Sequence, residues 1–173
     1  MSLIELLLGA AIFSLIMAAC VALLLAGWNS WAASSTQAQI SGALSQSISR
    51  MTNEISQSSA SGITGVPLDN NCPSDINNSV NTQMTFSIAQ HSNGSVVWSP
   101  SINYAQGFES NGQPQLIRTQ NGLTQTVATN ITSLKFCRAT TNMVYIQLTA
   151  SVPTAQGQQR SSTLNFKVLA HNP

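Results

Sequence analysis

The N-terminal third of the chain carries two successive hydrophobic patterns. Residues 6–26 contain no charged side chain, and these 21 positions at about 1.5 Å each give roughly 31 Å of helix, the thickness of a bilayer hydrocarbon core. Trp28 and Trp31 follow, as aromatic side chains do at a membrane–water interface. The pattern predicts a transmembrane helix over residues 1–28. A secretory signal peptide is disfavoured, because the apolar run is too long and lacks a basic start.

The same helix is expected to continue over residues 29–60 with apolar side chains on one face only. These side chains recur at steps of four, four, three and four residues and form an apolar stripe: Ile40, Leu44, Ile48, Met51 and Ile55. Serine, threonine and other polar residues occupy the remaining faces. We expect the apolar stripe to pack on a β-sheet of the same chain, and no cofactor site is indicated.

Residues 61–83 form a loop region rich in glycine, proline, serine and asparagine. Its oxygen-bearing side chains are candidate calcium ligands: Asp69, Asn70, Asn71, Asp75 and Asn77. They lack the Asp-x-Asp-x-Asp-Gly spacing of a calcium loop, so an ordinary loop that uses these side chains in turns is the favoured interpretation. No metal site is predicted.

Residues 84–173 show the alternation and turn signals of a β-sheet head. Eight strands are predicted: 84–90, 96–99, 102–105, 115–119, 124–128, 131–138, 144–152 and 163–170. Asn-Gly pairs at 93–94, 111–112 and 121–122 mark hairpin turns between them. Two sets of apolar residues each share one face: Val144, Ile146, Leu148, Ala150 and Val152, and Leu164, Phe166 and Val168. The sequence predicts an α+β fold in which the long helix lies on an antiparallel sheet.

The three cysteines fall into two environments. Cys20 lies in the apolar span, where it is a small buried side chain, while Cys72 and Cys137 lie in the head. A head exported across the membrane is in a compartment where disulfides persist, so a disulfide between Cys72 and Cys137 is predicted. A catalytic thiol is the alternative, but no histidine or asparagine stands near either cysteine in a known motif.

Composition and charge argue for a passive building block. Charged residues make up 6% of the chain and the net charge is +1, so direct nucleic-acid binding is not indicated. His91 and His171 are interpreted as solvated surface residues, and no phosphate loop, zinc spacing or nucleophile elbow is present. We therefore expect no enzymatic activity, with a membrane-tethered enzyme as the alternative.

Glu5 is the one charged residue at the start of the apolar helix. A carboxylate inside the membrane costs about 2.5–3.5 kcal/mol on insertion scales, which favours a partner or a function. A free α-amino group on Met1 of a neighbouring copy is a natural counter-charge, and such pairing between staggered helices suggests polymerisation. The alternative is that Glu5 lies solvated at headgroup depth.

Residues 2–10, SLIELLLGA, closely resemble the mature N-terminus of type IV pilins and type II secretion pseudopilins. The resemblance implies the ladle fold of that family, with a prepilin peptidase that cuts before Met1 and methylates the new amine. It implies that Glu5 guides docking at an inner-membrane assembly platform. It also implies helix packing in the filament core through Leu3, Ile4, Leu7, Ile12, Phe13 and Ile16. The head is more weakly similar to W-type minor pilins and J-type pseudopilins.

The expected function is that of a structural subunit which polymerises with copies of itself into a type IV pilus-like helical filament. Before assembly the chain is expected to be a single-pass protein of the bacterial inner membrane, and after assembly part of an extracellular or periplasmic filament. One alternative is a minor pilin or pseudopilin that primes a secretion or DNA-uptake filament. The alternative of another class is a monomeric, membrane-anchored binding protein.

Overall fold

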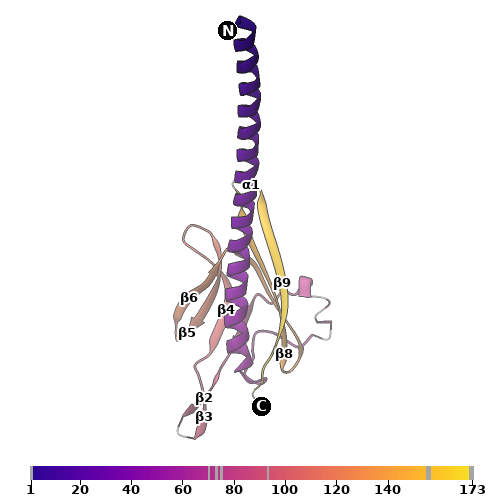
Figure 1. Cartoon of the computed structure of the whole chain (residues 1–173). Coiled ribbons are helices and arrows are strands. Elements are labelled where there is room, and N and C mark those ends of the chain that lie inside the picture. The colour runs from indigo at the N-terminus through magenta and orange to yellow at the C-terminus, as the bar shows by residue number, and fades with distance from the viewer. Residues whose placement is uncertain are drawn as a thin grey trace.

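A computed structural model describes residues 2–69, 71–72, 74, 76–92, 94–154 and 157–171. It shows one long helix that packs on antiparallel β-sheets, which confirms the predicted α+β class (Figure 1). Helix α1 runs without a break over Leu3–Ser56, a length of roughly 80 Å. The predicted end at residue 60 is too late. The Ser58 hydroxyl donates to the Ile55 carbonyl at 2.6 Å and competes with the helical hydrogen bonds, so the helix stops at a Gln57 C-cap.

The head contains nine described strands and a short 3-10 helix, η1, at Ile76–Asn78. The strands are β1 Gln83–Phe86, β2 Ala89–Ser92, β3 Ser95–Trp98, β4 Ile102–Phe108, β5 Pro114–Gln120, β6 Leu123–Thr129, β7 Ile131–Thr140, β8 Met143–Pro153 and β9 Gln159–Leu169. They form three antiparallel sheets, in the orders β1-β4-β5-β6, β2-β3 and β7-β8-β9. The nine strands overlap the eight predicted strand regions in order, and β1 and β2 divide the first region between them.

Two local features explain why one predicted sheet becomes three. Strand β7 begins directly after Asn130, whose positive φ of 64° turns the chain between β6 and β7, which belong to different sheets. The predicted strand 84–90 breaks near Ile88, whose backbone N–H donates to the Ser99 hydroxyl at 2.9 Å instead of to a neighbouring strand. Strand β1 therefore pairs with β4, while β2 forms a separate hairpin with β3.

The core lies between the second half of α1 and the sheets. Ile40, Leu44, Met51 and Ile55 of the apolar stripe are fully buried and Ile48 is half-buried against the core, which confirms their predicted contact with the sheet. The core face of β8 is buried over its whole length, as its alternation predicts. The face of β9 that we expected to be apolar is less covered, because Leu164 is 40% exposed at the edge of the sheet.

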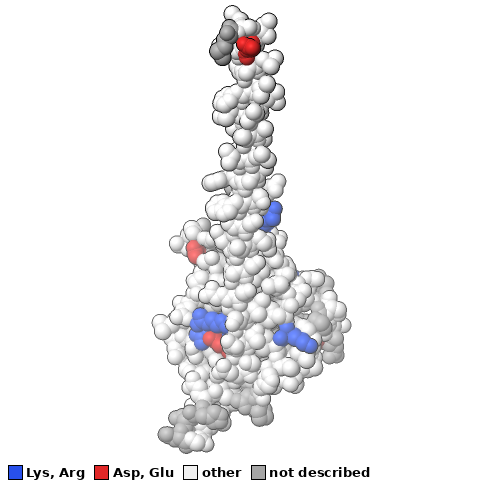
Figure 2. Space-filling model, in the orientation of Figure 1, with Lys and Arg blue, Asp and Glu red and all other residues white. Residues whose placement is uncertain are grey.

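The first part of α1 projects from the head as a stalk, residues 3–31, with every side chain exposed (Figure 1). By length and composition it is apolar enough to cross a membrane, with a mean hydropathy of 2.6 over its 18-residue window. On the face shown in Figure 2, the stalk carries a single charged group, an acid near its N-terminal end. An apolar surface of this extent is stable only in lipid or against other apolar chains.

A small group of charged side chains fixes α1 to the four-stranded sheet. Arg118 donates through Nε to both Glu54 oxygens at 3.0 and 2.8 Å, and the Tyr104 hydroxyl donates to Glu54 at 2.9 Å. Arg50 lies one helical turn before Glu54, at 3.5 Å, and donates to Gln125 at 2.9 Å. Burial raises the pKa of Tyr104 well above its usual value, and the adjacent Glu54 carboxylate raises it further. We call these residues the Glu54 cluster.

Replacement of Glu54 by glutamine leaves Arg118 without its counter-charge. The Arg118 side chain is only 12% exposed, so we expect Glu54→Gln to lower the free energy of unfolding by about 2–3 kcal/mol. Chemical unfolding of the full chain in detergent micelles measures this. Arg50→Gln is the matched control. Its side chain is 36% exposed, and we expect its loss to change stability by about 1 kcal/mol or less. Equal losses in the two variants would contradict a central role for Glu54.

The Glu54 cluster also makes stability sensitive to alkaline pH. Because the pKa of Tyr104 is higher in the folded than in the unfolded chain, its protonated hydroxyl stabilises the fold fully below about pH 10. That contribution is lost as the pH rises above this value. We expect the unfolding midpoint in denaturant to fall above pH 10 in the native chain and to fall less in Tyr104→Phe. An identical alkaline dependence in both chains would exclude Tyr104 as the cause.

Candidate functional site

The N-terminal end of α1 holds Glu5 in a capping box. The Ile4 backbone N–H donates to the Ser2 hydroxyl at 3.2 Å, and the Ser2 backbone N–H donates to Oε2 of Glu5 at 3.0 Å. This contact satisfies a helix-end donor that has no partner within the helix and places negative charge at the positive end of the helix dipole. The Ser-x-x-Glu spacing of residues 2–5 is the sequence signal for it, and it was missed because Glu5 was considered only as a membrane charge.

The capping box leaves Glu5 able to accept further hydrogen bonds. A carboxylate offers about four acceptor positions, and the Ser2 N–H uses one of them. Glu5 is exposed, so its second oxygen faces the surroundings of the helix. Met1, the other predicted member of this site, lies outside the described residues.

The six side chains predicted to pack in a filament core all lie on the exposed stalk. They are Leu3, Ile4, Leu7, Ile12, Phe13 and Ile16, and each is more than half exposed. At 100° per residue they point to all sides of the helix, so the stalk has no polar face along this segment. The Trp28 and Trp31 rings mark its end, with centroids 5.6 Å apart.

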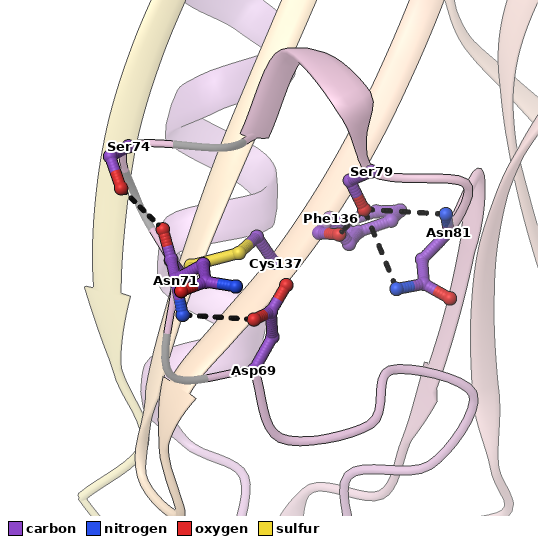
Figure 3. Close-up of a disulfide and its surroundings, with 8 residues drawn as sticks. Asp69, Asn71, Ser74, Ser79, Asn81, Phe136 and Cys137 are labelled. Carbon is purple, nitrogen blue, oxygen red and sulfur yellow. Dashed lines mark hydrogen bonds between the residues drawn. A yellow bond between two sulfur atoms is a disulfide. The ribbon is translucent and has the colours of Figure 1, made fainter.

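The predicted disulfide between Cys72 and Cys137 is present, which confirms that pairing. It joins the loop region to β7 with a Cα–Cα distance of 5.8 Å (Figure 3). Nearby, the Ser79 hydroxyl donates to the Phe136 carbonyl at 2.6 Å. Cys20 is free and exposed on the stalk. An apolar N-terminal helix fits a membrane anchor or signal, and the disulfide fits a head outside the cytoplasm.

Polar side chains of the loop region form hydrogen bonds within the loop and to β8. Oδ1 of Asp69 accepts the Asn71 backbone N–H at 2.9 Å, and the Asn77 amide oxygen accepts from Gln147 at 2.7 Å (Figure 3 shows the first contact). Two of the side-chain oxygens weighed as calcium ligands, one from Asp69 and one from Asn77, therefore accept hydrogen bonds from the protein itself, whereas Asn70 and Asp75 lie outside the described residues. Within the described ranges, no group of three His, Cys, Asp or Glu side chains is placed to hold a metal ion.

A hollow of about 500 Å³ lies between the loop region and the outer face of the β7-β8-β9 sheet. Its lining includes Ile76, Tyr145, Phe166 and Lys167 and is mostly apolar. The volume lies within the usual range for small-ligand sites. Tyr145 and Ile76 pack against the disulfide, so the bond supports one wall of this hollow.

The two histidines belong to different parts of the head. His171 follows β9, is exposed, and its Nδ1 lies 3.0 Å from the Leu169 carbonyl oxygen. His91 is in β2, and its side chain lies outside the part of the chain that is described.

Comparison of the chain with protein-family models, with curated proteins and with solved structures finds no match in any of the three.

The disulfide closes a long loop, because the two cysteines are 65 residues apart. Its reduction should lower the stability of the head by about 4 kcal/mol in the chain-entropy model. We expect reduction of the full chain in micelles to increase proteolysis of the loop region and head strongly. Cys20→Ser is the control, since this exposed thiol lies outside the closed loop and its loss should leave protease resistance unchanged. Equal resistance before and after reduction would contradict a stabilising role.

Proposed function

We propose that this chain is a structural subunit of a type IV pilus-like filament. The observation that carries the proposal is the stalk, which is apolar on all sides and exposed along its whole length, with Glu5 as its one acid. The resemblance of residues 2–10 to mature pilins and pseudopilins supports it, as does the packing of α1 on antiparallel sheets.

The apolar surface of the stalk suits two successive environments, first the membrane and then the interior of a filament. Each large apolar side chain gains about 1.5–3 kcal/mol on leaving water, so the stalk first requires the membrane. Neighbouring stalks offer the same apolar surroundings when the subunits leave the membrane together. A head held outside the bilayer by an apolar helix is therefore suited to parallel stacking, with stalks inside and heads outside.

In this proposal Glu5 sets the stagger between copies. One carboxylate oxygen accepts the Ser2 N–H of its own chain, and the remaining acceptor positions bind the methylated amine at Met1 of a neighbour. An unpaired charge in an apolar filament core is strongly unfavourable, so a subunit docks only where this pair forms.

The proposal includes the family's partners and location. A prepilin peptidase and an inner-membrane assembly platform would act on the chain before it leaves the membrane, and the role is polymerisation without catalytic turnover. A minor pilin or pseudopilin that primes a filament is the variant of the same proposal, and the weak resemblance of the head to those subunits favours it.

A second candidate is a monomeric, membrane-anchored binding protein. The hollow beside Tyr145 and Lys167 favours it, because a mostly apolar recess with one nearby cation suits a small ligand. Such a protein needs its anchor only for attachment, so its activity would not depend on Glu5.

The test is a pair of substitutions, Glu5→Ala and Glu5→Gln, in cells that make the full chain. We expect both variants to enter the membrane normally and to be reduced at least about tenfold in filaments sheared from the cell surface, because each lacks the charge that pairs with a neighbour's amine. Quantitative mass spectrometry measures both fractions and the mass of the N-terminal peptide, which should begin with methylated Met1.

Leu8→Ile, an apolar exchange on the same stalk, is the matched control and should assemble normally. Normal incorporation of both Glu5 variants would contradict the pairing mechanism. Absence of the native chain from every sheared fraction would instead favour the membrane-anchored binding protein.

A further inference from the structure

One flank of the head, beside the emerging stalk, carries an unpaired cation. The end of β9 is fixed to the end of α1, where the His171 N–H donates to the Ser56 carbonyl at 3.2 Å. From His171 back to Arg160 the chain runs beside α1 for about 36 Å, which corresponds to roughly 24 residues of helix. Arg160, the second residue of β9, therefore lies near the level of residue 32 of α1. Arg160 is exposed, and its side chain has no hydrogen bond or ion pair within the described structure.

The other flank carries an acid without a cation. Strands β4 and β5 are fixed at the Glu54 cluster through Tyr104 and Arg118, and five residues beyond Tyr104 the chain reaches Glu109 in the β4–β5 turn. This distance is about 16 Å along the strand, which places Glu109 near the level of residue 43 of α1. Its carboxylate accepts one hydrogen bond, from the Asn111 amide at 3.2 Å, and contacts no cation in the described structure.

These two flanks lie on opposite sides of α1. Figure 1 shows β4, β5 and β6 on one side of the helix and β9 on the other. Figure 2 shows one acidic group and one basic group, on opposite sides of the helix, where the stalk joins the head. The same surface therefore offers negative charge to a neighbour on one side and positive charge to a neighbour on the other.

Each flank also exposes a large apolar side chain close to its charge. Phe108, next to Glu109, is 66% exposed, and Leu164, four residues from Arg160 on the same face of β9, is 40% exposed. By strand alternation both side chains lie on the sheet faces that turn toward α1, but beyond the area that α1 covers. Each flank therefore has an apolar patch beside a charge, and the two flanks carry opposite charges. Such flanks suit an interface in which one flank of each copy contacts the other flank of the next copy.

We propose that the Glu109 flank of one copy docks on the Arg160 flank of the next copy, with Glu109 and Arg160 paired across the interface. This inference rests on the proposed filament and names its contact between heads. The stagger agrees with it. When Glu5 of one copy pairs with Met1 of its neighbour, the neighbour is shifted along the helix axis by four residues, about 6 Å, in the direction from stalk to head. The same shift carries the neighbour's Arg160 toward Glu109 of the first copy and reduces their axial offset from about 16 Å to roughly 10 Å, which the extended arginine and glutamate side chains can bridge together.

The test is charge reversal in the full chain, scored as the yield of sheared filaments per membrane-inserted subunit. We expect Glu109→Arg and Arg160→Glu to lower the yield about tenfold each, because like charges then face one another across every interface. The double variant places a cation at position 109 and an acid at position 160, so opposite charges again face one another. We expect it to recover most of the yield. Lys167→Glu makes the same charge change on β9, away from this flank, and should leave the yield unchanged.

A second measurement does not depend on yield. In a Cys20→Ser chain, which lacks the free thiol of the stalk, Glu109→Cys and Arg160→Cys together should form oxidised ladders of covalently joined subunits. Either single variant in the same background should stop at dimers or monomers. Normal yields in both reversals, or a double variant no better than the single ones, together with no ladder, would overturn the proposed pair. Filaments of the native chain would still form in that case, so this failure is distinct from failure of the proposed function, in which the native chain does not polymerise.

Discussion

The structure depends on one constraint, that a single unbroken helix must satisfy two different surroundings. Over residues 3–31 the helix is apolar on every side, and all of its side chains are exposed. Over the second half it is apolar on one stripe, and Ile40, Leu44, Met51 and Ile55 are buried against the sheets. The change from an apolar cylinder to an apolar stripe sets where the head begins, because a sheet can cover only one side of a helix.

Charged residues are scarce in this chain, so a few of them determine both how the helix is fixed to the sheet and how the surface is charged. With 6% charged residues, the fold uses Glu54 and Arg118 to fix the helix against the sheet, since both are largely removed from water and their hydrogen-bonding geometry is specific. The surface that remains is nearly neutral. A side chain without a partner among the described residues, such as Arg160, therefore lies on a surface that provides few competing electrostatic contacts.

The sequence predicted those parts of the structure that rest on local periodicity. The apolar stripe of α1, the buried face of β8 and most strand positions repeat at fixed spacing, and the disulfide followed from the placement of only two cysteines in the head. The sheet division and the Glu54 cluster were not predictable in this way. Arg118 and Glu54 are 64 residues apart, and their meeting depends on the complete arrangement of β4 and β5 against the helix. The exposure of Leu164 is similar, because its pattern indicates a buried face but the helix does not extend over it.

The unbroken course of α1 has a consequence for orientation. A continuous helix turns by about 100° per residue, so the direction in which Glu5 points is locked to the faces of a head some tens of ångströms away. One residue inserted between the stalk and the apolar stripe would swing the acid through that angle while every contact within the head stayed intact. The packing of α1 on the sheets therefore fixes the direction, around the helix axis, in which Glu5 faces its surroundings.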